Sequence, residues 1–351
     1  MVRTIKFGNR LVGEGQPVYL VAEAGINHNG DVGLARQLIA AAHKVGADAV
    51  KFQSFETDRF ICRSALSAPH VDRELGVDGT FYDLLKKLEL PPDAYPELHA
   101  YAQQVGIPMA SSPFDERYVD LLDRLDVPFF KVASMDLDNL DFIRYVARKK
   151  RPMVISTGMG TLAEVAEAVE AARGTGNHDL VLLHCTSQYP PDPSDVNLRA
   201  IQTLQSAFPD LVVGYSDHTV GVHVPLAAAA LGAVVIEKHF TLDKKMPGPD
   251  QKGSADPQEM ITLRAHLDDL ARARGTGIKM PTGGEEMVKK AFRRSVVMAK
   301  ACAKGHALTR DDVALMRPGT GISPKYVDLV IGRRLRLDVQ SQHILSWGDL
   351  E

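Results

Sequence analysis

The stretch VYLVAEAGINHNG, residues 18–30, begins as an apolar run and ends in a group of polar residues. Helical patterns such as residues 32–45 and 161–176 separate this run from similar ones, which favours parallel strands joined by helices. Eight strand–helix units predict a (β/α)₈ barrel, whose active-site residues project from the C-terminal ends of its strands. The other seven runs are ADAVKFQSF (47–55), IPMASSPFD (107–115), VPFFKVASMD (127–136), RPMVISTGMG (151–160), LVLLHCTSQYP (180–190), LVVGYSDHT (211–219) and AVVIEKHFT (233–241).

Composition excludes several classes of protein. Hydrophobic residues make up 45% of the chain and charged residues 24%, which is typical of a soluble globular protein. The net charge of −3 gives no basic field for nucleic acid. No apolar run approaches a membrane span, and the N-terminus lacks the apolar core of a signal peptide. Cys62, Cys185 and Cys302 form no CxxC pair, which favours a reducing compartment. We therefore expect a cytoplasmic protein without nucleic-acid or membrane partners.

The chain has 351 residues, about 100 more than a typical barrel needs. Residues 273–286, ARGTGIKMPTGGEE, are rich in Gly and Pro and are typical of a linker. Short β-rich segments follow, which suit a small domain of marginal stability by itself. We predict a barrel at 1–274, a linker at 275–284 and a small β-rich domain at 285–351. The long connection at 55–90 predicts a lid or an elaborated rim at the active-site end.

Two histidines are the best candidates for metal ligands. His218 and His239 follow the seventh and eighth predicted strands, which are neighbours in a closed barrel. Two imidazoles at one mouth suit a divalent ion such as Mn, Fe, Co or Zn. The alternative is that both histidines only form hydrogen bonds. His184 lies inside LLHCT and is expected to be structural or to support a ligand.

Two lysines point to an anion site. Lys51 and Lys131 end the second and fourth predicted strands, and a buried ammonium group is costly unless an anion pairs with it. Phosphate is the natural candidate, because it accepts many charge-assisted hydrogen bonds. A class I aldolase would instead use one lysine to form a Schiff base. Serines at other strand ends complete the predicted site: Ser134, Ser156, Ser187 and Ser216.

Carboxylates also end the strands. Glu23 follows the first strand, and near a bound metal it is a candidate general base towards metal-bound water. Its alternative role is a buried structural carboxylate paired with a lysine. Asp217 and Glu237 lie close to the two histidines in the sequence. We expect strand alternation to point both of them away from the cavity.

Several of these segments, in this order, resemble the sialic acid synthases: AEAGINHNGD, AVKFQSF, FKVASMD, VISTGMG, LLHCTSQYP, GYSDHT and EKHFTLDKKMPGPD. The C-terminal segments RRSVVMAK, LTRDDVALMRPGTGIS and VIGRRL resemble the antifreeze-protein-like (SAF) domain of that family. The resemblance covers nearly the whole chain and implies a TIM barrel followed by a SAF domain. It also implies condensation of phosphoenolpyruvate and water with an acetamido sugar aldehyde of the N-acetylmannosamine type, giving a nonulosonic acid and phosphate.

The resemblance implies a role for each candidate residue. It implies that His218 and His239 bind a divalent metal, most often Mn²⁺ with Mg²⁺ or Co²⁺ as alternatives. It also implies that Glu23 is the essential carboxylate. It implies a domain-swapped homodimer in which Arg317 of the small domain reaches the sugar in the partner's barrel. The implied phosphoenolpyruvate ligands are Lys51, Lys131, Ser134, Ser156, Ser187 and Ser216, and the implied sugar contacts are Gln53, Asp136, Tyr189 and Asp250.

Three departures from the family pattern leave the acceptor sugar open. Asp136 stands where many members have Glu, Ser187 replaces a common Asn, and Gln251 stands where synthases of legionaminic-type acids often have His. The acceptor is N-acetylmannosamine, its 6-phosphate or a 2,4-diacetamido-6-deoxy hexose. Two other functions remain open: a related 3-deoxy-ulosonic acid synthase using a sugar phosphate without an acetamido group, and a non-catalytic sugar-binding relative in surface polysaccharide assembly.

Overall fold

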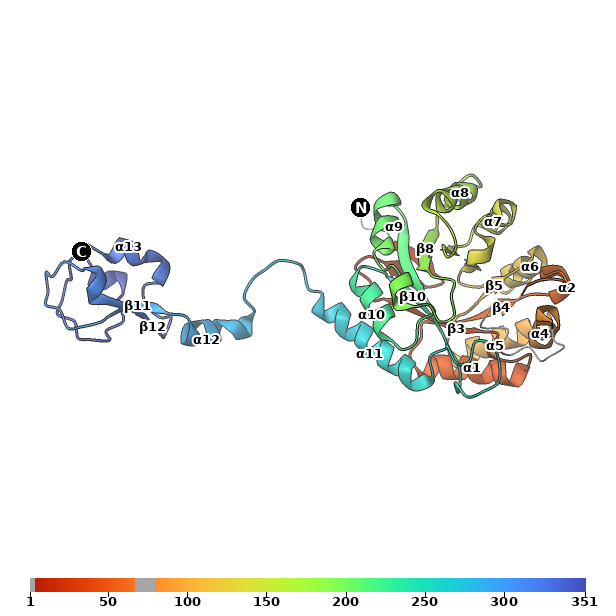
Figure 1. Ribbon diagram of the computed structural model, residues 1–351, viewed down its shortest axis with the longest axis horizontal. Coiled ribbons are helices and arrows are strands. Elements are labelled where there is room, and N and C mark those ends of the chain that lie inside the picture. The colour runs from red at the N-terminus through yellow and green to blue at the C-terminus, as the bar shows by residue number, and fades with distance from the viewer. Residues whose placement is uncertain (1–3, 67–79) are drawn as a thin grey trace. The chain divides into compact units, whose positions relative to one another are not determined.

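The computed structural model describes residues 4–66 and 80–351. The chain divides into two compact units, residues 1–275 and 276–351, and each is described here by itself. Eight parallel strands form a closed barrel in the first unit, which confirms the predicted fold (Figure 1). Each predicted apolar run contains one strand: β3 (Tyr19–Gly25), β4 (Ala49–Ser54), β5 (Met109–Pro113), β6 (Phe130–Val132), β7 (Met153–Ser156), β8 (Leu180–Cys185), β9 (Val212–Asp217) and β10 (Val235–His239).

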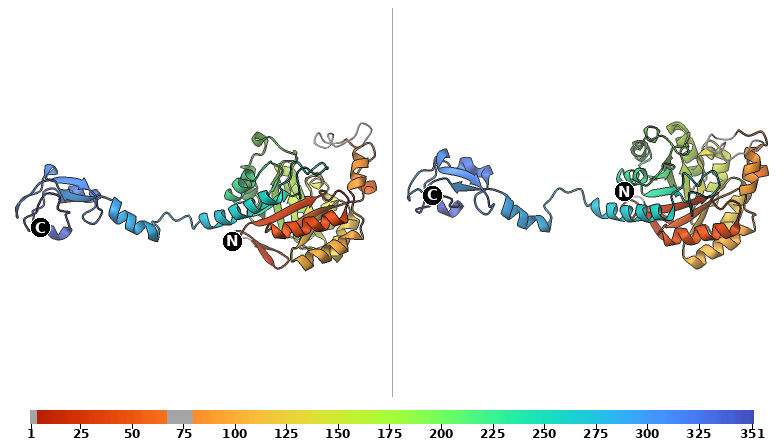
Figure 2. Two further views of the ribbon diagram at one scale, coloured as in Figure 1. Left: turned by 90° about the horizontal axis from the view of Figure 1, so that it is seen from below. Right: turned by 60° about the horizontal axis from the view of Figure 1, so that its bottom comes forward.

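Helices surround the barrel (Figures 1 and 2). Their apolar faces pack on the outer side chains of the strands and form the largest core of the protein. Burial of one Leu, Ile or Val side chain in such a core contributes about 1.5–3 kcal/mol. Among the described residues, no helix is both long and apolar enough to cross a membrane. The helices are α1 (Val32–Lys44), α5 (Ala94–Val105), α6 (Glu116–Arg124), α7 (Leu140–Ala147), α8 (Leu162–Arg173), α9 (Ala200–Ala207), α10 (His223–Ala230) and α11 (Pro257–Ala273).

An antiparallel hairpin, β1 (Thr4–Phe7) and β2 (Arg10–Gly13), precedes the barrel. The ring of Phe7 packs against the rings of Tyr19, at 5.2 Å between centroids, and Phe129, at 4.5 Å. Both partners lie near the starts of strands, in a core formed with residues of other strands. The hairpin therefore covers the N-terminal end of the barrel and leaves the C-terminal end for a site. Sequence analysis did not predict it.

The second unit is small and rich in short β-segments, as predicted. Strands β11 (Ser295–Met298) and β12 (Val313–Met316) pair in antiparallel fashion. A separate apolar core, which includes Val296, Leu308 and Leu335, holds the unit together. Short helical segments complete it: η3 (Arg310–Asp312), η4 (Pro324–Tyr326), α13 (Val327–Val330) and η5 (Trp347–Asp349). Helix α12 (Gly283–Phe292) precedes β11 and buries none of its residues.

Candidate active site

A cavity of about 320 Å³ opens at the C-terminal ends of the barrel strands. Asp136 lies in the short helix η1 (Ser134–Asp136) after β6, outside the cavity lining, and Arg317 lies in the second unit. All other predicted site residues line this cavity: Glu23, Lys51, Gln53, Lys131, Ser134, Ser156, Ser187, Tyr189, Ser216, His218, His239 and Asp250. The structure therefore brings together side chains that are spread over more than 200 positions of sequence.

Strand register explains part of this convergence. Glu23 of β3 pairs in register with His239 of β10 on one side and with Lys51 of β4 on the other. Residues at the same level of neighbouring parallel strands project to the same side of the sheet. A candidate metal ligand, a carboxylate and an ammonium group are thus placed side by side.

Four buried charges form the floor of the cavity. Lys51 Nζ lies 2.6 Å from Glu23 Oε2 and 3.8 Å from Glu237 Oε2. Lys131 Nζ lies 3.6 Å from Glu237 Oε1, which also accepts a hydrogen bond from Ser216 Oγ at 3.0 Å. All four charged side chains are at most 5% exposed, so each charge is compensated by its neighbours rather than by water.

The two carboxyl groups differ in their affinity for a proton. Burial raises the pKa of Glu23, and the nearby Lys51 only partly offsets this effect. Burial alone would also raise the pKa of Glu237, but Lys131 and Lys51 together lower it to about 2. Glu237 is therefore the permanently ionised partner of both lysines. Glu23 is the group able to gain and lose a proton, which is how a pair of carboxyl groups divides acid–base work.

The expectation that Glu237 points away from the cavity is wrong. Residues two apart on a strand share a face, so Glu237 projects to the same side as His239. The corresponding expectation for Asp217 is right. Its carboxylate lies outside the cavity, where it pairs with Lys238 at 2.6 Å and accepts a hydrogen bond from the Thr219 hydroxyl at 2.9 Å. This buried network holds the turn that carries His218.

The two histidines lie close together, and His218 is oriented by a hydrogen bond. His218 Nδ1 lies 2.8 Å from the carbonyl oxygen of Thr186, so this nitrogen carries a proton and, in the neutral ring, Nε2 keeps its lone pair. His239 Nδ1 is buried, lies 3.5 Å from a carboxylate oxygen of Asp250 and forms no hydrogen bond with the described residues. The ring centroids are 5.1 Å apart. A hydrogen bond on one ring nitrogen that frees the other is the usual arrangement of a metal-ligating histidine, and His218 has it. The buried Nδ1 of His239, which has no hydrogen-bond partner among the described residues, is a second candidate ligand atom. The residues present therefore fit a divalent metal.

Polar atoms remain available for a ligand. Ser156 Oγ and Asp136 Oδ2 are buried and have no hydrogen-bond partner within residues 4–66 and 80–351. Burial raises the pKa of Asp136 to about 6. A Cβ atom at Gly158 would lie 2.3 Å from Ser187 Oγ and 2.7 Å from Ser134 Oγ. Glycine at this position therefore allows both serines to converge on the cavity, where buried polar groups call for partners.

One side of the cavity is apolar. Its residues, which we name the apolar wall, are Ile26, Phe55, Phe60, Phe81, Leu84, Leu85 and Phe114. The rings of Phe60 and Phe114 stack at 4.6 Å between centroids. Part of the wall comes from α2 (Thr57–Phe60) and α4 (Phe81–Leu88), inside the connection predicted to be a lid or rim. That prediction also concerns residues 67–79, which lie outside the described residues.

Sequence analysis missed this wall together with Cys185, Ser112 and Glu237, which also line the cavity. Cys185 Sγ lies 3.9 Å from His218 Nδ1, and Ser112 Oγ accepts a hydrogen bond from Lys51 at 3.0 Å. The period-two alternation of strands contained the signal for Glu237, because His239 was already assigned to the cavity. No local pattern identified the wall, since its residues come from separate loops and helices.

Two residues considered in the sequence lie outside this cavity. Gln251 is fully buried, donates from Nε2 to the carbonyl oxygen of Asn27 at 3.0 Å and bonds to Thr241. It fixes the loop after β10 and does not line the cavity. His184 Nε2 lies 2.7 Å from the carbonyl oxygen of Val196, which agrees with the predicted supporting role.

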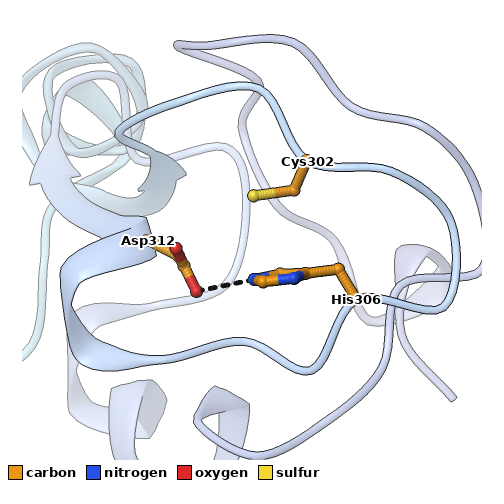
Figure 3. A group of neighbouring side chains, drawn as sticks. All are labelled: Cys302, His306 and Asp312. Carbon is orange, nitrogen blue, oxygen red and sulfur yellow. Dashed lines mark hydrogen bonds and ion pairs between the residues drawn. The ribbon is translucent and has the colours of Figure 1, made fainter.

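The second unit contains a cluster of metal-ligand type, Cys302, His306 and Asp312 (Figure 3). Their ligand atoms all lie within 4.8 Å of one another. The Asp312 carboxylate is already engaged by His306 at 2.9 Å, by Lys300 at 2.8 Å and by the backbone and side chain of Thr309 at 2.7 Å. The Lys300 ammonium group opposes a second cation at this carboxylate. The cluster is best explained as structural, because it closes the turn before β12.

Comparison with known proteins identifies the family. Residues 38–279 match the NeuB family, and residues 293–351 match the SAF domain. The chain belongs to the NeuB family. Its NeuB-family relatives include N,N'-diacetyllegionaminic acid synthase of Legionella pneumophila, which is 41% identical over 97% of this chain and 96% of the relative. The N-acetylneuraminate-9-phosphate synthase of Homo sapiens is 36% identical over 94% of this chain and 92% of the relative.

A solved structure agrees with this NeuB-family assignment. The N-acetylneuraminic acid synthetase of Leptospira borgpetersenii, crystallised with citrate, has a TM-score of 0.73 and 32% identity, and the match covers 82% of this chain and 95% of that one. These three relatives are named as synthases or a synthetase, and the NeuB-family chain is a sialic-acid-synthase-like enzyme.

Proposed function

We propose that the enzyme condenses phosphoenolpyruvate with water and the open-chain aldehyde of an acetamido sugar of the N-acetylmannosamine type. The products are a nonulosonic acid and phosphate. The observation that carries this proposal is the presence, in one cavity, of two buried lysines with serine hydroxyls and of two neighbouring imidazoles. The names of the relatives, which are synthases of legionaminic acid and of N-acetylneuraminate 9-phosphate, support the same chemistry.

The lysines and serines form the proposed phosphoenolpyruvate site. Lys51 and Lys131 neutralise the carboxylate and the phosphate, and the serines supply hydrogen bonds to their oxygens. Both lysines are already held by buried carboxylates, so their ammonium groups are in place before the substrate enters. The proposed serine ligands are Ser134, Ser156, Ser187 and Ser216.

The other end of the cavity is the proposed acceptor site. His218 and His239 would hold a divalent metal, for which we propose Mn²⁺, with Mg²⁺ or Co²⁺ as alternatives. When bound, the metal supplies a Lewis acid for the aldehyde oxygen. The side chains of Gln53, Tyr189 and Asp250, which line the cavity, are proposed to position the sugar, and Asp136, next to the lining residue Met135, is proposed as a further contact. The barrel holds the two reacting carbons close together.

The chemistry forms one carbon–carbon bond and breaks one carbon–oxygen bond. The methylene carbon of phosphoenolpyruvate attacks the aldehyde carbon, whose oxygen takes a proton and becomes a hydroxyl. Water adds at C2 of the former phosphoenolpyruvate and gives a proton to Glu23, whose raised pKa suits a general base and which returns this proton to the former aldehyde oxygen. Phosphate then leaves from C2 with the proton of the added hydroxyl, and a carbonyl group remains there.

The second unit supports a proposal about assembly. Helix α12 leaves large apolar side chains, among them Met287 and Phe292, outside the core of the second unit. Such a surface calls for a covering partner. We propose a domain-swapped homodimer in which Arg317 serves the site of the other chain. The three free cysteines support a reducing compartment, which we take to be the cytoplasm.

Phosphate release coupled to mass spectrometry of the product tests the proposed reaction. The purified enzyme is incubated with phosphoenolpyruvate, a divalent metal and a panel of aldehydes. Release that depends on an acetamido sugar, with a product mass equal to that of the sugar plus pyruvate, is the expected result. Release only with a sugar phosphate that lacks an acetamido group would favour the related synthase. Sugar binding without any release would favour the non-catalytic relative.

A further inference from the structure

The two histidines of the site differ in how their backbones are held. His239 is the last residue of β10 and pairs in register with Glu23 of β3, and the Phe240 amide after it donates to the Glu23 carbonyl oxygen at 2.7 Å. His218 lies one residue beyond the end of β9, directly after Asp217. The barrel ladder therefore fixes His239, whereas the position of His218 depends on the turn that follows β9.

A buried ion pair holds this turn. Asp217 of β9 and Lys238 of β10 are register partners in neighbouring strands, and their charged groups lie 2.6 Å apart with at most 1% of either side chain exposed. The Lys238 ammonium group also donates to the carbonyl oxygen of Thr219. From the strand that ends in His239, Lys238 thus contacts the residue on each side of His218.

The Asp217 carboxylate binds the rest of the turn. Its oxygens accept hydrogen bonds from the Thr219 amide at 3.1 Å, from the Thr219 hydroxyl at 2.9 Å and from the Tyr215 hydroxyl at 3.0 Å. Neither Asp217 nor Lys238 lines the cavity, because strand alternation directs both side chains to the outer face of the barrel. The pair can therefore act on the reaction only through the residues that it positions.

We propose that Asp217 and Lys238 are positioning residues, which fix the distance between the two imidazoles and so set the affinity of the site for its divalent metal. This inference rests on the proposed function, which assigns the metal to His218 and His239. Two imidazoles bind a metal well only when their separation is correct before binding, because otherwise part of the binding free energy is used to order the turn. Groups that orient metal ligands typically change metal affinity by about 10–100-fold.

Lys238→Met tests the inference directly, because Met keeps an apolar stem and removes the ammonium group. The full-length protein is freed of metal with a chelator and titrated with Mn²⁺, and free Mn²⁺ is measured by electron paramagnetic resonance. We expect the dissociation constant for Mn²⁺ to rise about 10–100-fold relative to the wild type. The KM for phosphoenolpyruvate should not change, since Lys51 and Lys131 are untouched, and saturating Mn²⁺ should restore most of the phosphate release.

Two further variants separate positioning from stability. Lys238→Met leaves a buried carboxylate without its cation, so it also destabilises the barrel. The double variant Asp217→Asn/Lys238→Gln removes the ion pair without leaving an unpaired charge, and it should weaken Mn²⁺ binding in the same way even if Lys238→Met does not fold. The matched control is Arg264→Met, which breaks a largely buried pair with Asp48, at 3.3 Å, just before β4 at the opposite end of the barrel. This control should lower the urea midpoint and leave the Mn²⁺ dissociation constant unchanged.

The outcomes distinguish the inference from the proposed function. An unchanged Mn²⁺ dissociation constant in the folded Asp217 and Lys238 variants would overturn the inference and leave the proposed reaction intact. An equal rise in Arg264→Met would overturn it as well, because any loosening of the barrel would then weaken the site. If the wild type binds no Mn²⁺, the proposed Mn²⁺ site and this inference fail together.

Discussion

Replacement of Lys51 by Met should destabilise the barrel in a pH-dependent way. Lys51 Nζ lies 2.6 Å from Glu23 Oε2, and both side chains are at most 2% exposed. At this distance the gross attraction is about 6 kcal/mol for an effective dielectric constant near 20. The desolvation cost of the Lys51 ammonium group offsets part of this attraction, and the uncharged Met side chain does not have that cost. Loss of one partner of a buried pair typically costs about 3–5 kcal/mol, and we expect a loss in this range at neutral pH.

The loss should decrease at low pH. The pKa of Glu23 is raised in the folded state by burial, and loss of Lys51 raises it further, because the lysine is the largest influence that lowers it. A carboxyl group whose folded-state pKa is raised gives stability at low pH that is lost as the pH rises through that pKa. The difference between Lys51→Met and the wild type should therefore be smaller near about pH 5 than near about pH 8.

The assay is urea unfolding followed by circular dichroism, which reports mainly the barrel helices. The single tryptophan, Trp347, lies in the second unit, so its fluorescence reports the unfolding of that unit. The urea midpoint followed by this fluorescence should be the same in the variant and the wild type. Lys149→Met is the matched control, because Lys149 pairs with Asp120 at a partly exposed site and should contribute less than about 1 kcal/mol. Equal losses for both variants, or a loss for Lys51→Met that does not vary with pH, would refute the reasoning.

Four further predictions concern activity. His218→Ala or His239→Ala should abolish phosphate release without unfolding the barrel. A chelator should inactivate the wild type, and a divalent metal should restore its activity; full activity after exhaustive metal removal would contradict the metal site. Glu23→Gln should retain both substrates but lower kcat by roughly 10²–10⁴-fold, and a decrease of less than about tenfold would exclude a role as general base. The KM for the acceptor should rise as the pH falls through about 6, because protonated Asp136 accepts hydrogen bonds less well, and Asp136→Asn should remove this dependence. A mixture of Arg317→Ala and His218→Ala subunits should regain activity after verified subunit exchange. If activity does not return, Arg317 does not serve the site of the other chain.

Much of the barrel and of the polar site was predictable from sequence. Buried strands need continuous apolar runs, and eight runs separated by helical patterns leave few alternatives to a closed parallel barrel. Because parallel strands end at the same edge, polar residues at the ends of the runs were expected to meet. His239, Glu23 and Lys51 do so in adjacent register positions.

Other features depended on contacts that no local pattern encodes. The sequence determined the eight strands, their order and the polar residues at their ends, because burial and alternation are properties of short segments. Only the tertiary structure decided that Glu237 pairs with both lysines, that the hairpin with Phe7 covers the opposite end and that α2 and α4 complete an apolar wall. Each of these depends on barrel closure and on packing between segments distant in sequence, since these set which side chains share a water-excluded space.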